Sequence, residues 1–135
     1  MEEARREPDP WTAFAGHVTR LCREQARDQG LADLLAIGHR GRVLQDLRAQ
    51  AYKRFAVLIH AAKAQGSLRA DFTAEDVVLL MMANAGVVER SGPSAPAASE
   101  RFVALALDGF RSVGASPAPP AVSPRTLIAA LRRRR

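Results

Sequence analysis

The residue types that most often carry chemistry are few in this chain and lie far apart. None of the three histidines, His17, His39 and His60, has a cysteine or carboxylate at the spacing of a metal-ligand set. The sequence contains no GxGxxG, no Walker loop and no GxSxG. We therefore predict no catalytic residue, no metal site and no cofactor. An all-α enzyme is the least supported class of protein, because no nucleophile–base pair or carboxylate pair lies at a telling spacing.

The single cysteine, Cys22, lies on the apolar stripe of a predicted helix. A free cysteine there most often behaves as a small hydrophobic residue, and a catalytic thiol would lack a partner base. One cysteine excludes an internal disulfide and fits a reducing compartment. The first ten residues, MEEARREPDP, have no apolar core of a signal peptide. We therefore expect a cytoplasmic protein.

Met81, Met82 and Asn84 give weaker signals of a binding site. Methionine usually fills a core, but it also suits adaptable ligand pockets. Asn84 is the one amide in an otherwise apolar run, and a buried amide without partners costs about 1–3 kcal/mol. Three interpretations stay open for Asn84: a buried amide bonded within the chain, a ligand contact, or a pairing across a dimer axis.

The stretch that must position these residues is Val77–Val88, VVLLMMANAGVV, which holds no charged residue. Thr73 precedes it as the expected N-cap, with Glu75 and Asp76 in the first turn. The run is shorter than the ~20 apolar residues that span a membrane. A soluble helix that is apolar all round must be covered all round. We expect its own domain to cover one side and a second subunit the other.

The remaining segments show helical periodicity and no convincing strand alternation. We predict an all-α fold of five or six helices. The first helix has Asp9 as its N-cap and Pro10 at its first position, and the second and longest ends before Gly66. The full set of expected helices covers residues 10–29, a short piece at 31–36, 43–65, 73–90 and, after a loop at 91–98, a last core helix at 99–112 capped by Ser99.

The net charge of +6 resides mainly in the C-terminal segment. Residues 113–135 carry Arg125 and Arg132–Arg135 and no acid, so the rest of the chain is close to neutral. Residues 112–123 are rich in Pro, Ala and Ser and indicate a linker, and 124–135 could form a short basic amphipathic helix. We expect 113–135 to be largely disordered without a partner. A contact of the arginines with nucleic acid or with an acidic surface is the alternative.

Taken in order, these segments resemble a known family. The blocks AQGSLRADFTAEDVVLLMMANAGVV and ERFVALALDGFR are similar to the C-terminal, effector-binding and dimerisation domain of TetR-family (tetracycline-repressor-like) bacterial transcriptional regulators. The resemblance covers residues 9–112 and implies that the helices at 73–90 and 99–112 form a four-helix bundle with a twofold mate. It also implies a cavity for a small, largely apolar effector, walled by the earlier helices.

The resemblance and the periodicity together assign two groups of residues. The expected ligand-binding residues are Trp11, Phe14, Val18, Phe55, Ile59, Met81, Asn84 and Val88. The expected homodimer interface contains Leu79, Met82, Ala83, Gly86, Phe102, Ala106, Gly109 and Phe110.

Members of the family carry a helix-turn-helix ahead of this domain, and no such segment stands before residue 9. We therefore assign DNA recognition to no residue, and interpret residues 1–8 as a remnant of the linking helix. The leading hypothesis is an effector-sensing domain of a TetR-like regulator. The alternative is an interaction module that heterodimerises with a full-length regulator and antagonises it.

Overall fold

A computed structural model describes residues 9–27 and 42–132 of the chain. These residues form an all-α fold, and within them the only pairing of strand type is an isolated antiparallel bridge between Leu68 and Arg111. The all-α prediction is confirmed. The helices are α2 (Pro10–Arg27), α4 (Arg42–Gln65), α5 (Ala74–Ser91), the short 3₁₀ helix η1 (Gly92–Ser94), α6 (Ala95–Phe110) and α7 (Pro124–Arg132). None of them is long and apolar enough to cross a membrane.

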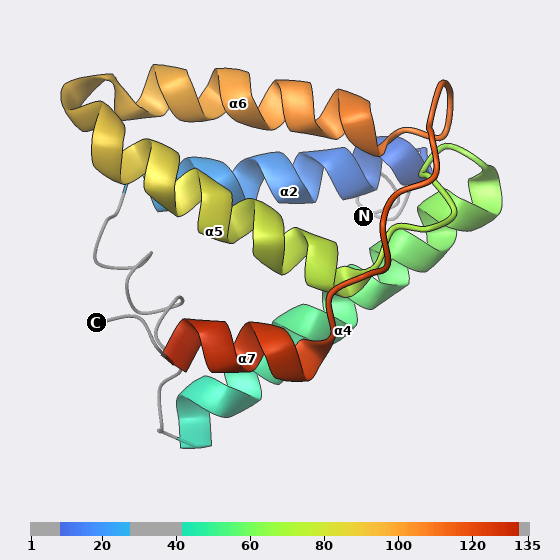
Figure 1. Cartoon of the computed structure of the whole chain (residues 1–135), viewed down its shortest axis with the longest axis horizontal. Helices are drawn as coiled ribbons and strands as arrows, with labels where there is room; N and C mark the ends of the chain where they lie inside the picture. The colour runs from blue at the N-terminus through green and yellow to red at the C-terminus, as the bar shows by residue number, and fades with distance from the viewer. Residues whose placement is uncertain (1–8, 28–41, 133–135) are drawn as a thin grey trace, which may run out of the picture.

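Three helices form the body of the domain. α5 and α6 pack against each other, and α2 packs against both of them (Figure 1). α4 packs on α2 through its C-terminal part, where Phe55 lies beside His17 and Gln65 bonds to Trp11, and it contacts α5 only weakly. It therefore crosses the body at one end (Figure 1). α7 lies beside α5. The hydroxyl of Tyr52 on α4 donates to Glu75 on α5 at 2.8 Å and helps to hold these two helices together.

The core fills the space between α2 and the other helices. Phe14, Val18 and Cys22 are almost fully buried on one stripe of α2, at helical spacings of four residues. Phe14 meets Phe72 edge to face, with ring centroids 5.5 Å apart. A fully buried side chain of this kind contributes about 1.5–3 kcal/mol to folding. The other core members are Phe55, Ile59, Ala62, Leu68, Val77, Leu80, Val103 and Leu107.

The helix ends follow local rules that the sequence predicts correctly. The carboxylate of Asp9 accepts the backbone N–H of Thr12 at 2.9 Å, as an N-cap does. At the start of α5, the backbone N–H of Thr73 donates to Asp76 at 2.8 Å and completes a capping box. α4 ends at Gln65, and Gly66 follows with a φ of +92°, which costs glycine little.

The predicted start of the last core helix is wrong. α6 begins at Ala95, so half of the expected loop at 91–98 is already helix. Of the rest, Ser91 ends α5, and the 3₁₀ turn Gly92–Ser94 leads directly into α6. Pro96 is in the first turn, where a proline is tolerated because its missing N–H would have no helical partner. Ser99 lies inside the helix, 2% exposed, and bonds to another helix instead of capping its own. The expectations for residues 28–41, including the piece at 31–36, fall outside the described residues.

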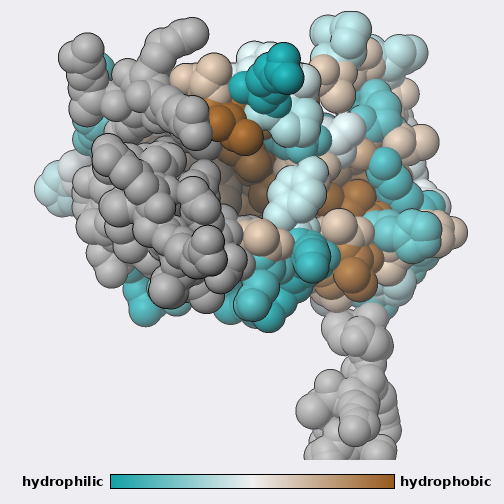
Figure 2. Space-filling model, turned by 90° about the horizontal axis from the view of Figure 1, so that it is seen from below, coloured by the Kyte–Doolittle hydropathy of each residue, from teal (hydrophilic) through white to brown (hydrophobic). Residues whose placement is uncertain are grey.

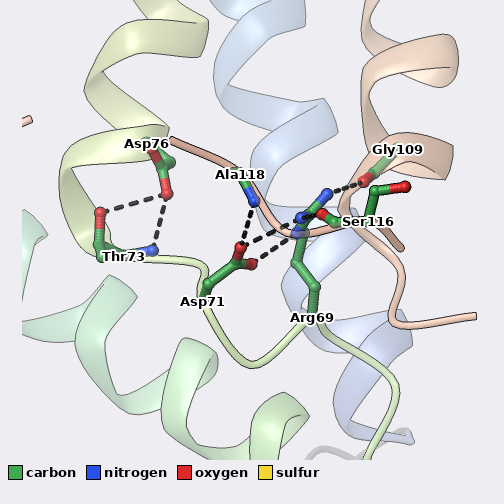
Figure 3. Close-up of polar contacts among 7 residues, drawn as sticks. All are labelled: Arg69, Asp71, Thr73, Asp76, Gly109, Ser116 and Ala118. Atoms are coloured by element: carbon green, nitrogen blue, oxygen red, sulfur yellow. Dashed lines mark hydrogen bonds and ion pairs between the residues drawn. The ribbon is translucent and has the colours of Figure 1, made fainter. Parts of the chain in front are cut away.

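The segment after α6 is held against the α4–α5 connection (Figure 3). Ser112 N–H donates to Ser67 O at 2.9 Å, and Arg69 N–H donates to Phe110 O at 2.9 Å. The Arg69 guanidinium pairs with Asp71 at 2.6 Å and also donates to the carbonyls of Gly109 and Ser116. Asp71 in turn accepts the N–H of Ala118 at 3.3 Å.

α7 continues this attachment, because its Leu127 is only 5% exposed. The expectation of a largely disordered segment is therefore wrong for residues 124–132. An isolated helix of this length is unstable in water, but a buried leucine and a fixed connection supply the missing stabilisation. Figure 2 shows the side of the molecule on which α4 and α7 lie. Hydrophobic residues are grouped there, with hydrophilic residues around them.

Candidate functional site

α5 is divided into a buried and an exposed apolar side. Val77, Leu80, Asn84 and Val88 face the interior. The opposite side exposes Leu79 by 38% and Met82 by 37%, together with Ala83 and Gly86. These four residues follow one another at spacings of three, one and three, which places them on one stripe of the helix.

α6 continues the exposed apolar surface beside α5. Leu105 is 56% exposed and Gly109 is exposed one turn further on. We call Leu79, Met82, Ala83, Gly86, Leu105 and Gly109 the α5–α6 stripe. Since α2 packs against both helices, it covers the side of the pair that faces the core, and no described helix supplies a side chain against the Cβ positions of Gly86 or Gly109.

The other residues expected at a dimer interface lie differently. Phe102, Ala106 and Phe110 are half-buried and pack against the chain's own core. Phe110 lies with its ring centroid 4.8 Å from that of Phe72. Much of each side chain therefore already stabilises the single chain.

Most residues expected to bind a ligand are members of the core. Phe14, Val18, Phe55 and Ile59 lie together in the buried core, and their role in ligand binding stays a prediction. Val88 is buried and Met81 is half-buried on α5. Trp11 packs at the edge of the core, with the guanidinium of Arg111 4.3 Å above its ring, and it borders an open hollow of about 560 Å³.

Asn84 is the centre of a buried polar network that joins three helices. Its amide donates to Gln25 Oε1 at 2.9 Å and to the carbonyl of Cys22 at 3.3 Å, both on α2. Its Oδ1 accepts the hydroxyl of Ser99 on α6 at 2.7 Å. Gln25 completes the network by donating to Met81 O at 3.0 Å. Asn84 is 0% exposed, and of its three interpretations the one that accounts for this burial is an amide bonded within the chain.

A pocket of about 400 Å³ lies between α2 and α6, a volume within the range of small-molecule sites. We call it the α2–α6 pocket. Its walls are mainly apolar, with Ser99 among them and charged residues at Arg23, Arg27 and Glu100. Arg23 and Glu100 face each other across it at 3.8 Å, and both side chains are more than half exposed. The complete lining is Thr19, Cys22, Arg23, Ala26, Arg27, Pro96, Ser99, Glu100, Val103, Ala104 and Leu107.

The titratable groups near the core are poor candidates for catalysis. Burial raises the pKa of Cys22 to about 11, so its thiol is neutral and weakly nucleophilic near neutral pH. Burial, followed by the nearby charges of Arg20 and Arg54, lowers the pKa of His17, whose ring centroid lies 4.6 Å from that of Phe55. Within residues 9–27 and 42–132, no three His, Cys, Asp or Glu side chains gather in an arrangement that could hold a metal ion.

Sequence reasoning missed the α2–α6 pocket and the role of Gln25. Gln25 follows Val18 and Cys22 at spacings of seven and three, so its place on the buried stripe of α2 was available from the helical period. The pocket gave no such signal, because Arg23, Arg27 and Glu100 look like ordinary solvated positions on helix surfaces.

Comparison with known proteins gives one match. The family model for the C-terminal domain of SbtR-like transcriptional regulators, a domain of the TetR type, matches residues 9–112. The match begins at the N-cap of α2 and ends just after α6, so it covers the three-helix body and α4. No curated protein and no solved structure matches the chain.

Proposed function

The chain belongs to the TetR-like transcriptional regulators through the SbtR-like C-terminal domain at residues 9–112, and from this premise we propose that it is the effector-sensing and dimerisation domain of such a regulator. Two elements of the structure support the proposal. The α5–α6 stripe offers a surface for a second copy of the chain, and the α2–α6 pocket offers a space for a small ligand.

The α5–α6 stripe is the observation that carries the proposal. Three large apolar side chains, Leu79, Met82 and Leu105, are each more than a third exposed. Complete burial of such side chains is worth roughly 1.5–3 kcal/mol each, so a partner that covers the remaining exposed part recovers a fraction of that amount. A twofold axis pairs such a surface with its own copy, which is the commonest closed arrangement of subunits. The predicted product is a four-helix bundle made of α5 and α6 from each protomer.

Small residues favour close packing in this bundle. Ala83, Gly86 and Gly109 alternate with the larger side chains on the stripe and let the backbones of two helices approach each other. A Cβ atom added at Gly86 or Gly109 would meet no heavy atom within 4 Å in the single chain. We therefore expect a large side chain at either position to keep the fold of the single chain and to obstruct a partner.

In a complete regulator, the effector would act by changing the relative positions of the two protomers. Such coupling requires an effector that binds two arrangements of the dimer with different affinity. The helices of the bundle are suited to this task, because small shifts of helices at a subunit interface are a common form of allosteric change.

The mass of the chain in solution tests the proposal directly. We expect light scattering after gel filtration to give a dimer for the wild type at micromolar concentration. Gly86→Arg and Gly109→Arg should each give a monomer with unchanged helix content. Ala56→Arg, which adds the same side chain at an exposed position of α4, is the control and should stay dimeric. A wild-type chain that is a stable monomer would contradict the dimerisation role.

A further inference from the structure

We propose that the α2–α6 pocket binds a small organic carboxylate with a compact apolar body, and that this ligand acts on the dimer through α6. The inference deepens the proposed function and rests on it for the regulatory role alone. Binding itself requires only the pocket of the single chain. The occupant follows from the walls, the charges and the position of the pocket on α6.

The walls of the pocket select an apolar body. Ala26 on α2 and Val103, Ala104 and Leu107 on α6 present hydrocarbon to the space, and Cys22 adds a neutral thiol. Burial against such a surface is favourable for aromatic and aliphatic groups and unfavourable for a charged group without a partner. A ligand of this site therefore places its hydrocarbon inside and its polar head at the charged edge.

The charges of the lining favour an anionic head over a cationic one. Arg23 and Arg27 stand one helical turn apart on α2, and Glu100 is the one acid of the lining. The contact of Arg23 with Glu100, at 3.8 Å and largely in solvent, is loose and easily rearranged. A carboxylate can take up the planar, bidentate geometry that arginine prefers. An ammonium head would meet two arginines against one glutamate.

The pocket is connected to the stripe by α6, which contributes to both. Val103, Ala104 and Leu107 line the pocket, while Leu105 and Gly109 belong to the α5–α6 stripe. Ser99 also lines the pocket, and its hydroxyl bonds to Asn84 on α5 at 2.7 Å. A ligand bound between α2 and α6 would therefore shift α6, one helix of the proposed interface. It would also disturb the polar network that holds α5, the other helix.

A matched series of three soluble probes tests the inference: 3-phenylpropanoate, 3-phenylpropan-1-ol and 3-phenylpropylammonium. Each is titrated into ¹⁵N-labelled full chain and followed by two-dimensional NMR. We expect saturable shifts with the carboxylate, centred on residues that line the pocket, weaker binding of the alcohol and the weakest binding of the ammonium ion. Shifts confined to other helices would overturn the assignment. Equal affinity for the carboxylate and the ammonium ion would also overturn the proposal. So would the absence of saturation at a carboxylate concentration of about 10 mM, which is ten times a weak Kd of ~1 mM.

Variants separate the charge from the apolar space. Arg27→Gln should raise the Kd of the carboxylate about fivefold, the effect of one exposed charge pair, and leave that of the alcohol unchanged. Lys53→Gln on α4 removes an exposed positive charge elsewhere and should change neither. A carboxylate Kd that is the same in Arg27→Gln and wild type would exclude the arginine contact.

Filling the pocket should abolish binding of both the carboxylate and the alcohol. Ala26→Trp fills it from α2 and Ala104→Trp from α6, so that each checks the other if one fails to fold. Ala64→Trp, at an exposed position of α4, is the control. Ala26→Trp should keep the wild-type mass in light scattering, so that a failure of the pocket and a failure of the dimer give different results. Wild-type binding in a folded filled variant would overturn the proposal.

Discussion

Replacing Asn84 by leucine tests the network that joins α2, α5 and α6. The substitution keeps the approximate size of the side chain and removes its donor and acceptor. Gln25 Oε1 then loses its donor at 2.9 Å, and the hydroxyl of Ser99 loses its acceptor at 2.7 Å. Both partners are at least 96% buried, so water cannot replace the missing bonds without a rearrangement of the core.

The expected loss of stability follows from these two orphaned groups. Each unsatisfied buried group costs about 1–3 kcal/mol, and the apolar gain of leucine offsets a part of the sum. The carbonyl of Cys22 adds little, because at 3.3 Å it is the longest bond of the three. We expect Asn84→Leu to lower the free energy of unfolding by about 2–4 kcal/mol. Asn84→Leu combined with Ser99→Ala should recover about 1 kcal/mol, because it removes the orphaned hydroxyl.

Urea unfolding followed by circular dichroism measures these differences. All variants must be compared at one protein concentration, because the apparent stability of a chain that dimerises, as proposed for this one, depends on its concentration. Lys53→Leu, on the exposed surface of α4, is the control and should stay within about 0.5 kcal/mol of the wild type. A loss below about 0.5 kcal/mol for Asn84→Leu would show that the network does not hold the helices together.

Three further perturbations address the rest of the structure. Because burial lowers the pKa of His17 from 6.5, the unfolded chain binds the proton more readily than the folded one. The contribution of His17 to the free energy of unfolding should be complete above pH 6.5 and should be lost as pH falls through the lower folded pKa, and His17→Gln should flatten this decline. Arg69→Ala removes the bonds to Gly109 O, Ser116 O and Asp71. Trypsin should then cleave after Arg125 about fivefold faster than in the wild type, which corresponds to a loss of about 1 kcal/mol in the stability of the attached segment. Arg101→Ala is the control, and equal cleavage rates in Arg69→Ala and the wild type would contradict the attachment. Leu127→Asp should release α7, with a loss of helical circular dichroism and an unchanged dimer mass, and a retained α7 signal would show that the buried leucine is not what holds this helix.

Most helices and most of their ends could be predicted from local residue patterns alone. Asp9, Thr73 and Gly66 act on the backbone within a few residues of themselves, so their effect is visible without a fold. The apolar character of Val77–Val88 also predicts a cover on both sides of this helix. Leu79 and Met82 stay exposed in the single chain, and the second subunit that would cover them stays a prediction. Membership of the TetR-like regulators was recognisable because these segments occur in a fixed order.

Which side of each helix faces which neighbour depends on the packing of the whole chain. The period of α5 alone does not show whether Asn84 meets a ligand, a partner or its own chain, because hydrogen-bond partners from α2 and α6 lie 15 or more positions away. Ser99 likewise looks like a cap until Asn84 lies opposite it. Arg69 and Leu127 stabilise the C-terminal segment through contacts that no local rule contains. The α2–α6 pocket is a property of two surfaces that meet, and its position is fixed only when the helices pack.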